Sequence, residues 1–310
     1  MQNDSINLTT AQSIFLGMYS LLVILVGLIG NTTVICTSLK HNAIKLDCVI
    51  LTFIQNLAVA DILYITVVVI PSFITTSTGA WVFGQLLCDV FAQLKIIPAM
   101  ANTIFVLAIT IQRLVLFTCP FRGCSARAAK IWAGCIWGGI ILFLLPFVVY
   151  YKPRGEVVLG IGMCLTTLHT IAKVAALFTT ALTVLLPMVL IIITNIIICV
   201  IANKHSSVDS RIKRRRQGNN ILLISLISGV FILSWILYII RNLLPVKYDT
   251  LDLVAFNCLA INSCANPILY SLTNLRFRKY LIKRWNDFKN IFECRSWKEY
   301  SSAMSTTTSL

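Results

Sequence analysis

The chain has 310 residues, of which 58% are hydrophobic and only 12% are charged, and its mean hydropathy is +0.86. A soluble surface needs roughly twice this fraction of charged residues, so the composition excludes a soluble enzyme, a disordered protein and a small disulfide-rich domain. It indicates an integral membrane protein. We therefore expect the net charge of +15 to orient the chain in a membrane, with no nucleic acid as partner.

Seven apolar stretches approach or exceed the roughly 20 residues that a helix needs to cross a bilayer. Helices satisfy their own backbone groups in hydrocarbon, and the alternating pattern of a barrel is not visible. The sequence therefore predicts an all-α membrane protein, a seven-transmembrane helix bundle within residues 14–272. The predicted spans are Ile14–Leu39, Cys48–Ile74, Leu86–Phe117, Ala128–Tyr150, Ile171–Ala202, Gln217–Leu244 and Leu251–Leu272.

The distribution of basic residues predicts the orientation of these spans. Twenty of the 26 Lys and Arg residues lie around the loops after spans one, three and five and in the C-terminal tail. That side is expected to be cytoplasmic, so residues 1–13 form an extracellular N-terminus, with glycosylation sequons at Asn3 and Asn7. Residues 273–310 form the cytoplasmic end, in which the basic amphipathic segment Leu275–Phe288 predicts a helix on the membrane surface before a Ser/Thr-rich tail.

Polar side chains inside the spans are costly in hydrocarbon and therefore mark candidate functional positions. Asp61 is the only charged residue of span two. Span three carries a polar stripe at helical spacing, and span seven adds a group of amide and hydroxyl side chains near its proline. The alternative is that these groups only hydrogen-bond between helices. The stripe is Cys88, Lys95, Asn102 and Arg113, and the span-seven group is Asn262, Ser263 and Asn266, followed by Pro267 and Tyr270.

Most of the 11 cysteines lie inside apolar stretches, where we expect them to be small buried side chains. Cys88 and Cys164 instead lie beside loops, where they could pair. The seven cysteines expected to be buried are Cys36, Cys48, Cys119, Cys135, Cys199, Cys258 and Cys264.

A series of short motifs, in order and each in its own span, resembles the rhodopsin-like (class A) G-protein-coupled receptors, and most of all their peptide-receptor branch. The resemblance covers nearly the whole chain. The motifs are Gly30-Asn31, Asn56-Leu57-Ala58-Val59-Ala60-Asp61, Trp81-Val82-Phe83-Gly84, Cys88, Arg113, Pro120-Phe121, Trp137, Pro146, Cys164, Pro187, Phe231, Trp235, Asn266-Pro267-Ile268-Leu269-Tyr270 and Phe277-Arg278.

Several positions depart from the pattern of that family, and they concern switching rather than fold. One is Leu114, which follows the span-three arginine where the family usually has an aromatic residue. The acid before the span-three arginine is replaced by Gln112, and the acid at the foot of span six by Gln217. Span six reads Ser234-Trp235-Ile236-Leu237 and so lacks the usual proline kink. Asn195 replaces a tyrosine of span five, and Thr103 replaces a core isoleucine of span three.

The resemblance implies a disulfide between Cys88 and Cys164, in an oxidising compartment. The second of these cysteines ends an apolar segment broken by glycines, Glu156–Cys164, which suggests a short hairpin of the kind that leaves the vestibule of peptide receptors open. The resemblance also implies a sodium pocket, because a hard cation prefers oxygen ligands. The alternative to a bound sodium ion is a protonated Asp61 held by the same neighbours. The residues of the implied pocket are Asp61, Asn102, Asn262, Ser263 and Asn266.

The implied ligand pocket lies between the extracellular halves of the spans and is cationic with aromatic walls. Lys95 occupies the place where amine receptors have an aspartate, and span seven has no lysine for a retinal Schiff base. Such a pocket suits a peptide or another anionic ligand. The alternative for Lys95 is snorkelling or an internal hydrogen bond. The implied pocket residues are Lys95, Tyr238, Arg241, Asn242 and Phe256.

On the cytoplasmic side the resemblance implies contacts of Arg113, Phe121 and Ile221 with a heterotrimeric G protein. The implied switch residues are Arg113, Phe231, Trp235, Pro267 and Tyr270. Cys294 is a candidate for palmitoylation, and the tail for phosphorylation and arrestin binding.

The sequence thus predicts a multi-pass receptor of the plasma membrane with membrane lipids as neighbours. It is expected to have no enzymatic activity and no cofactor apart from an allosteric sodium ion. The alternatives are an orphan or non-peptide receptor of the same fold, or a transporter or channel, although the inverted repeat of many transporters is not visible.

Overall fold

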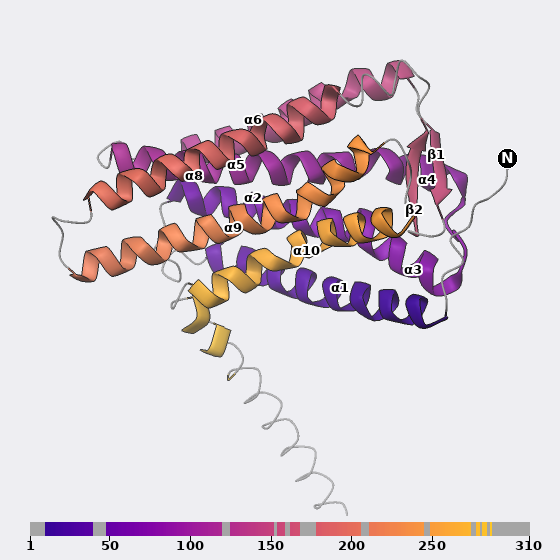
Figure 1. The fold of residues 1–310 in the computed structure, drawn as a ribbon, viewed down its shortest axis with the longest axis horizontal. Helices are drawn as coiled ribbons and strands as arrows, with labels where there is room; N and C mark the ends of the chain where they lie inside the picture. Colours follow the sequence, from indigo (N-terminus) through magenta and orange to yellow (C-terminus); the bar gives the residue numbers. More distant parts are fainter. Residues whose placement is uncertain are drawn as a thin grey trace, which may run out of the picture.

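The computed structural model describes residues 10–39, 48–119, 125–151, 154–158, 162–167, 178–205, 211–244 and 249–273, and seven positions between 277 and 286. Seven long helical segments run side by side along one axis, with a two-stranded hairpin at one end (Figure 1). The elements are α1 (Thr10–Leu39), α2 (Cys48–Tyr64), η1 (Ile65–Val69), α3 (Ile70–Thr78), α4 (Gly84–Leu94), α5 (Ile96–Thr118), α6 (Ala126–Tyr151), β1 (Arg154–Val158), β2 (Met163–Thr167), η3 (Ala181–Leu185), α8 (Leu186–His205), α9 (Arg211–Leu243) and α10 (Asp249–Thr273).

The prediction of seven spans is confirmed, with small differences at the ends. Six of the helical segments are long and apolar enough to cross a membrane. The remaining one, α9, has a shorter described apolar part, Ser225–Arg241. In the sequence its apolar residues begin at Ile221, after a basic segment at the start of the helix. The first helix already begins at Thr10, inside the segment 1–13 that was predicted to precede it.

Prolines explain most irregular turns of the helices. A π-helical turn precedes Pro71 at the start of α3, and another precedes Pro187 in α8. The third span breaks at Lys95, which lies between the last residue of α4 and the first residue of α5. Pro98 lies three residues beyond this break, and its ring clashes with the carbonyl group four residues before it. In contrast, α9 is one uninterrupted helix of 33 residues without proline.

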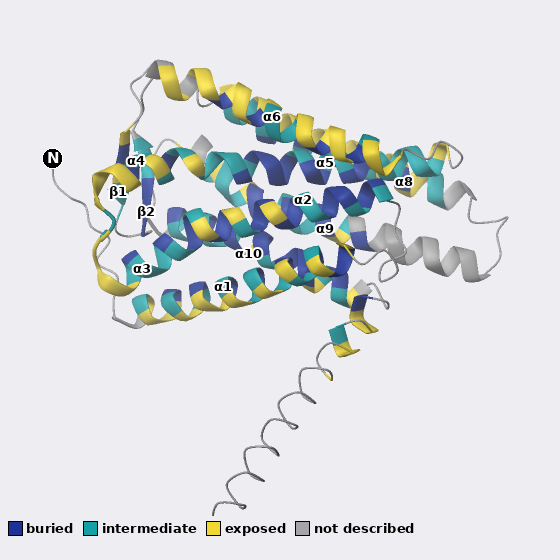
Figure 2. Ribbon diagram, turned by 180° about the vertical axis from the view of Figure 1, so that it is seen from behind, coloured by how far each residue is buried: buried dark blue, intermediate teal, exposed yellow. Residues whose placement is uncertain are grey.

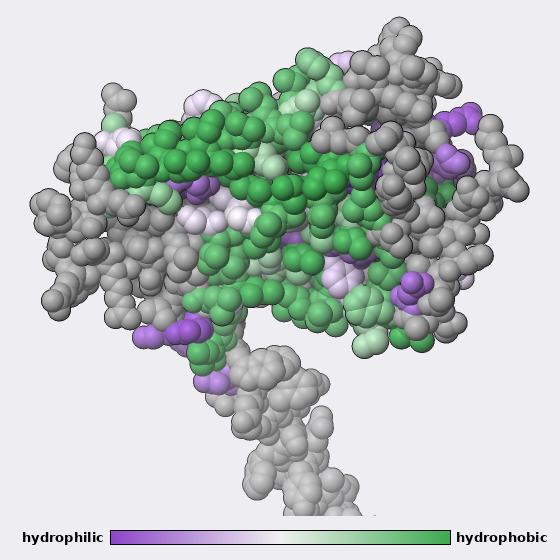
Figure 3. All heavy atoms as spheres, in the orientation of Figure 1, coloured by the Kyte–Doolittle hydropathy of each residue, from purple (hydrophilic) through white to green (hydrophobic). Residues whose placement is uncertain are grey.

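The bundle is apolar outside, and its mostly apolar core also encloses a set of polar side chains. Large side chains such as Phe15 and Leu142 are about 70% exposed on the outer faces of α1 and α6 (Figure 2). Figure 3 shows that apolar residues cover much of one face of the bundle, with a few hydrophilic residues between them. The interior buries polar residues such as Asn31, which is fully enclosed and donates hydrogen bonds to the carbonyl groups of Gly27 and Ser263 at 2.9 and 2.8 Å.

The expectation that seven cysteines are buried inside the protein is wrong. Cys36, Cys119, Cys135 and Cys199 are exposed, and the other three are only partly covered. An apolar stretch has a lipid-facing side as well as a core side, and small apolar residues suit both.

The hairpin and the surface helix follow the sequence predictions where the structure describes them. Strands β1 and β2 pair antiparallel, with Val157 opposite Cys164. The described positions of 275–288, which are 277–279, 281–283 and 286, are helical. Phe277 is buried there and packs edge-on against Tyr270, with the ring centroids 6.4 Å apart. This contact joins the surface helix to the end of α10.

Candidate functional site

A cavity of about 490 Å³ lies between the helices near the hairpin. Its lining is mostly apolar and aromatic, and its only charged members among the described residues are Lys95 and Arg241. Tyr238 and Phe256 also face the cavity, so four of the five predicted pocket residues meet there. The fifth, Asn242, has a side chain outside the described part of the structure.

Lys95 lies at the break between α4 and α5, where its side chain reaches the hairpin. Its Nζ atom donates a hydrogen bond of 2.8 Å to the backbone carbonyl group of Cys164. The lysine therefore has the internal partner that the alternative interpretation expected, and it also faces the cavity. An ammonium group has three donors, so one bond to a neutral carbonyl leaves its charge uncompensated by that partner.

Arg241 forms an ion pair that the sequence analysis missed. The side chain, in the last turn of α9, binds the carboxylate of Asp252 in α10 in a bidentate manner, through Nε to Oδ1 and through Nη2 to Oδ2 at 3.0 Å. Both side chains are largely enclosed, at 18% and 12% exposure. The signal available in the sequence was an acid and a base on either side of a short loop between two spans. That pattern alone does not show that the two side chains point toward each other.

Aromatic rings lead from the cavity into the core. Phe256 contacts Tyr238, Tyr238 contacts Trp235, and Trp235 contacts Phe231, with ring centroids 5.7, 5.6 and 6.0 Å apart. Phe231 is fully buried. Of the predicted switch residues, Trp235 lines the cavity and Phe231 packs against it in the core, so a change in the cavity can shift the core through this column of rings.

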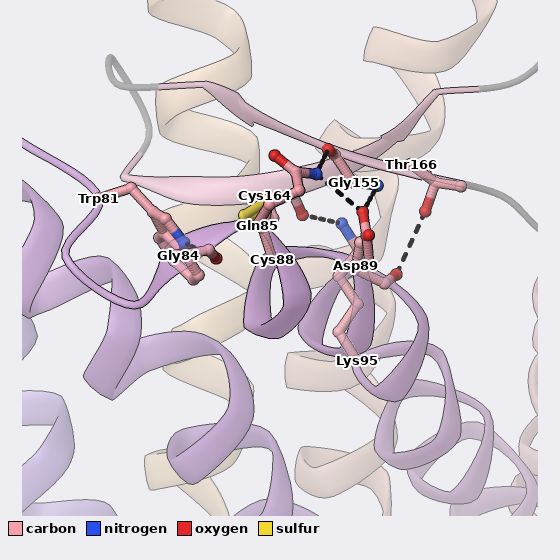
Figure 4. Close-up of a disulfide and its surroundings, with 10 residues drawn as sticks. Trp81, Gly84, Gln85, Cys88, Asp89, Lys95, Gly155, Cys164 and Thr166 are labelled. Carbon is pink, nitrogen blue, oxygen red and sulfur yellow. Dashed lines mark hydrogen bonds between the residues drawn. A yellow bond between two sulfur atoms is a disulfide. The ribbon is translucent and has the colours of Figure 1, made fainter.

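The hairpin is fastened to α4 by several bonds, shown in Figure 4. The disulfide between Cys88 and Cys164 is formed, as the resemblance implied. Asp89 accepts the backbone N–H of Gly155 at 2.7 Å, and Gln85 donates to the carbonyl group of the same glycine at 2.8 Å. A Cβ atom on Gly155 would lie 2.6 Å from the carbonyl oxygen of Cys88, so only glycine fits this approach.

This clamp of Gln85, Asp89 and Gly155 was not predicted from the sequence. Polar residues at a helix end are usually solvated, and only the folded hairpin reveals their partner. Thr166 adds a bond of 3.2 Å to the carbonyl group of Ala92, and the β2 residues Met163, Leu165 and Thr166 form part of the cavity wall. The hairpin is therefore a fixed wall of the cavity.

The residues predicted to form a sodium pocket are buried together in the middle of the bundle. Asp61 is fully buried and accepts a hydrogen bond of 2.9 Å from the amide of Asn266, and Asn102 and Ser263 lie beside the same carboxyl group. Asn262 is buried as well. Within the described residues, the second oxygen of Asp61 and the amide oxygen of Asn102 have no hydrogen-bond partner.

These two buried oxygens fit a hard cation, which prefers carboxylate and amide oxygens. No group of three or more His, Cys, Asp or Glu side chains suited to a metal ion occurs among the described residues. The donor set therefore fits sodium better than a transition metal.

The cytoplasmic half places some of the predicted switch residues in the core. Arg113 is half-buried near the end of α5, Pro267 lies inside α10, and Tyr270 is buried. Asn195, which replaces the usual tyrosine, donates to the carbonyl group of Ile191 in its own helix at 2.9 Å. Several predicted residues lie outside the described positions or side chains, namely Asn3, Asn7, Phe121, Ile221 and Cys294.

Comparisons with known proteins agree with this architecture. Residues 30–270 match the family model of the seven-transmembrane receptors of the rhodopsin family. Similar proteins include the rat somatostatin receptor type 5, with 28% identity over 87% of this chain and 77% of the receptor. The rat somatostatin receptor type 4 has 29% identity over 83% and 69%. The alpha-1A adrenergic receptor of Oryzias latipes has 25% identity over 88% and 67%.

Proposed function

The chain belongs to the rhodopsin family of seven-transmembrane receptors, and we propose that its extracellular ligand is a peptide with an acidic group that binds Lys95. It is a G-protein-coupled receptor and a multi-pass protein of the plasma membrane. Proteins of this family signal through G proteins and are not in general enzymes.

The proposal rests on the positive charge of the cavity. Lys95 and Arg241 are its charged lining residues, and Asp252 behind Arg241 supplies one compensating charge. The surroundings of the cavity therefore keep one excess positive charge in a mostly apolar space, which attracts a carboxylate and repels an amine. The fixed hairpin and the similarity to somatostatin receptors favour a peptide, and a non-peptide anion is the second candidate.

Three substitutions of Lys95 separate ligand binding from the internal hydrogen bond to Cys164. Lys95→Arg keeps the charge, Lys95→Gln keeps a donor for the carbonyl group but loses the charge, and Lys95→Ala loses both. Loss of a partly buried charge pair costs roughly 2–5 kcal/mol. We therefore expect Lys95→Gln to weaken the potency of an acidic agonist well over tenfold.

The agonist would come from a screen of peptide and small-anion libraries with a G-protein readout, at matched surface density of the variants. The control is a comparison of each acidic hit with its amidated analogue. Equal potency of both analogues on the unsubstituted receptor, or unchanged potency in Lys95→Gln, would assign Lys95 to the hairpin bond alone.

We propose in addition that Asp61 and Asn102 hold a sodium ion, with Asn262, Ser263 and Asn266 around it. The two buried oxygens without a hydrogen-bond partner support this. When bound, the ion supplies a positive charge that neutralises the buried carboxylate. The residues around it then hold α2, α5 and α10 together at their centre, which favours the inactive packing.

The cytoplasmic assignments rest on the family resemblance. We propose that Arg113, Phe121 and Ile221 contact the G protein, with Phe231, Trp235, Pro267 and Tyr270 as the switch. Palmitoylation of Cys294, arrestin binding by the Ser/Thr-rich tail and lipid contacts of the basic surface helix complete the cytoplasmic side. The segments 1–13, with glycosylation at Asn3 and Asn7, and 273–310 are the extracellular and cytoplasmic ends of this arrangement.

A further inference from the structure

We infer that the ion pair between Arg241 and Asp252 is a latch that holds α9 against α10 in the resting receptor and must open for signalling. The latch is the bidentate contact of these two side chains, which lie at the extracellular ends of their helices. The latch itself is tested by ligand-free G-protein signalling, whereas the way in which a ligand opens it rests on the proposed acidic ligand.

The latch acts on a helix that has no hinge. In α9 the residue two positions after Trp235 is Leu237 instead of proline, and the helix continues without interruption over Arg211–Leu243. Sharp kinks of helices arise at prolines, Gly/Ser pairs or π-bulges. Ser228 and Gly229 form one such pair in α9, but every residue of Arg211–Leu243 is α-helical, and the helix has no proline and no π-bulge. The two ends of this helix therefore move together, as the ends of a lever do.

The dimensions of the lever decide whether the ion pair can survive a movement. Phe231, fully buried in the core, is the natural pivot. Arg241 lies about 15 Å above it along the helix and Gln217 about 21 Å below it, at 1.5 Å per residue. A displacement of the cytoplasmic end by about 5 Å, roughly one helical turn, then moves the extracellular end by about 3.5 Å.

A displacement of this size weakens the contact of 3.0 Å between Nη2 and Oδ2 where the side chains do not follow the helix, because hydrogen bonds weaken steeply with distance and angle. The planar fork of the guanidinium makes the bidentate pair still more dependent on geometry. The pair therefore stabilises one position of α9 over the other. In a helix with a hinge, the same pair would restrain only the extracellular half.

The ligand cavity gives the latch a way to open. The guanidinium of Arg241 lines the cavity, whereas Asp252 is not among its lining residues. An acidic group that enters the cavity near Lys95 competes with Asp252 for this guanidinium. Asp252 thus acts as an internal counter-ion, and the receptor exchanges it for the acidic group of the ligand.

The test measures ligand-free G-protein activation at matched surface density in two variants that leave opposite residual charges. Arg241→Gln leaves the carboxylate, and Asp252→Asn leaves the guanidinium. We expect both to raise ligand-free activation by about threefold to tenfold. The matched control is Asp249→Asn, which removes the same charge from the first turn of the same helix and is expected to leave activation unchanged.

A second experiment tests the lever. Leu237→Pro introduces a hinge between the latch and the cytoplasmic end, so Asp252→Asn should have a smaller effect in that background than alone. If ligand-free activation rises in only one of the two single variants, the residual charge explains the effect, and the proposed latch is wrong. No rise in either, with normal surface density, would also overturn it. An equal effect of Asp252→Asn with and without the proline would overturn the lever.

Discussion

The neutral residue before Arg113 should give this receptor measurable signalling without ligand. In relatives an acid at this place restrains the arginine, and here the residue is Gln112. The structure places the amide nitrogen of Gln112 in a buried position without a hydrogen-bond partner among the described residues. The side-chain amide of Asn195 donates a hydrogen bond to the carbonyl group of Ile191 in its own helix.

Gln112→Asp restores the missing charge next to Arg113 and removes the buried amide donor. A charge-assisted hydrogen bond exceeds a neutral one by about 1–2 kcal/mol at a partly buried site. Because each 1.4 kcal/mol is a factor of ten in an equilibrium constant, the shift toward the inactive state is about fivefold to thirtyfold. Ligand-free activation of the G protein should fall by a similar factor.

The assay is nucleotide exchange on the G protein, without ligand, at equal receptor density in the membrane. Gln112→Asn is the matched control, because it has the length of aspartate without its charge. A fall in both variants would show that side-chain length, and not charge, is responsible. Ligand-free activation that stays flat or rises in Gln112→Asp would refute the reasoning and would indicate that the proline-free helix α9 and Asn195 dominate the balance.

Two further predictions concern sodium and the hairpin. If Asp61 holds sodium, agonist affinity falls as sodium rises, and Asp61→Asn abolishes this dependence in binding assays; equal sodium sensitivity would leave Asp61 as a hydrogen-bonding residue. Gly155→Ala places a Cβ atom against the backbone of Cys88, so it should destabilise the solubilised receptor by about 1–3 kcal/mol, seen as a lower Tm. Gly138→Ala, with no atom within 4 Å of its Cβ position, is the control, and an equal Tm in the two variants would contradict the close approach.

The parts of the structure that the sequence predicts are those with a local cause. Apolar length predicts the seven spans, and glycines among apolar residues predict the hairpin of β1 and β2. The break at Lys95 was not predicted, although Pro98 is a local signal for it, because it removes a backbone donor three residues later. The residues proposed to hold sodium could be singled out because each is a polar residue in an apolar span, whereas their role as a sodium pocket came from the family resemblance.

Other parts depend on contacts that no single position reveals. The pairing of Arg241 with Asp252 requires the loop to bring two helix ends together at a given rotation. The clamp on Gly155 requires the hairpin to lie on α4 before Gln85 and Asp89 have anything to bind. The exposed cysteines were mistaken for core residues because hydropathy does not distinguish a lipid-facing side from a helix-facing side.

The departures from the family pattern have a common physical consequence when they are placed in the structure. Restraint is reduced at the cytoplasmic end, where Gln112 is neutral, and is present at the extracellular end, where Asp252 binds Arg241. A kinked helix would keep these two ends partly independent, so a restraint at the extracellular end could not replace one at the cytoplasmic end. Because α9 has no hinge, the extracellular ion pair can restrain the whole helix. The loss of the proline and the loss of the cytoplasmic acids are therefore compatible changes, since the first lets a contact beside the ligand cavity control the G-protein surface directly.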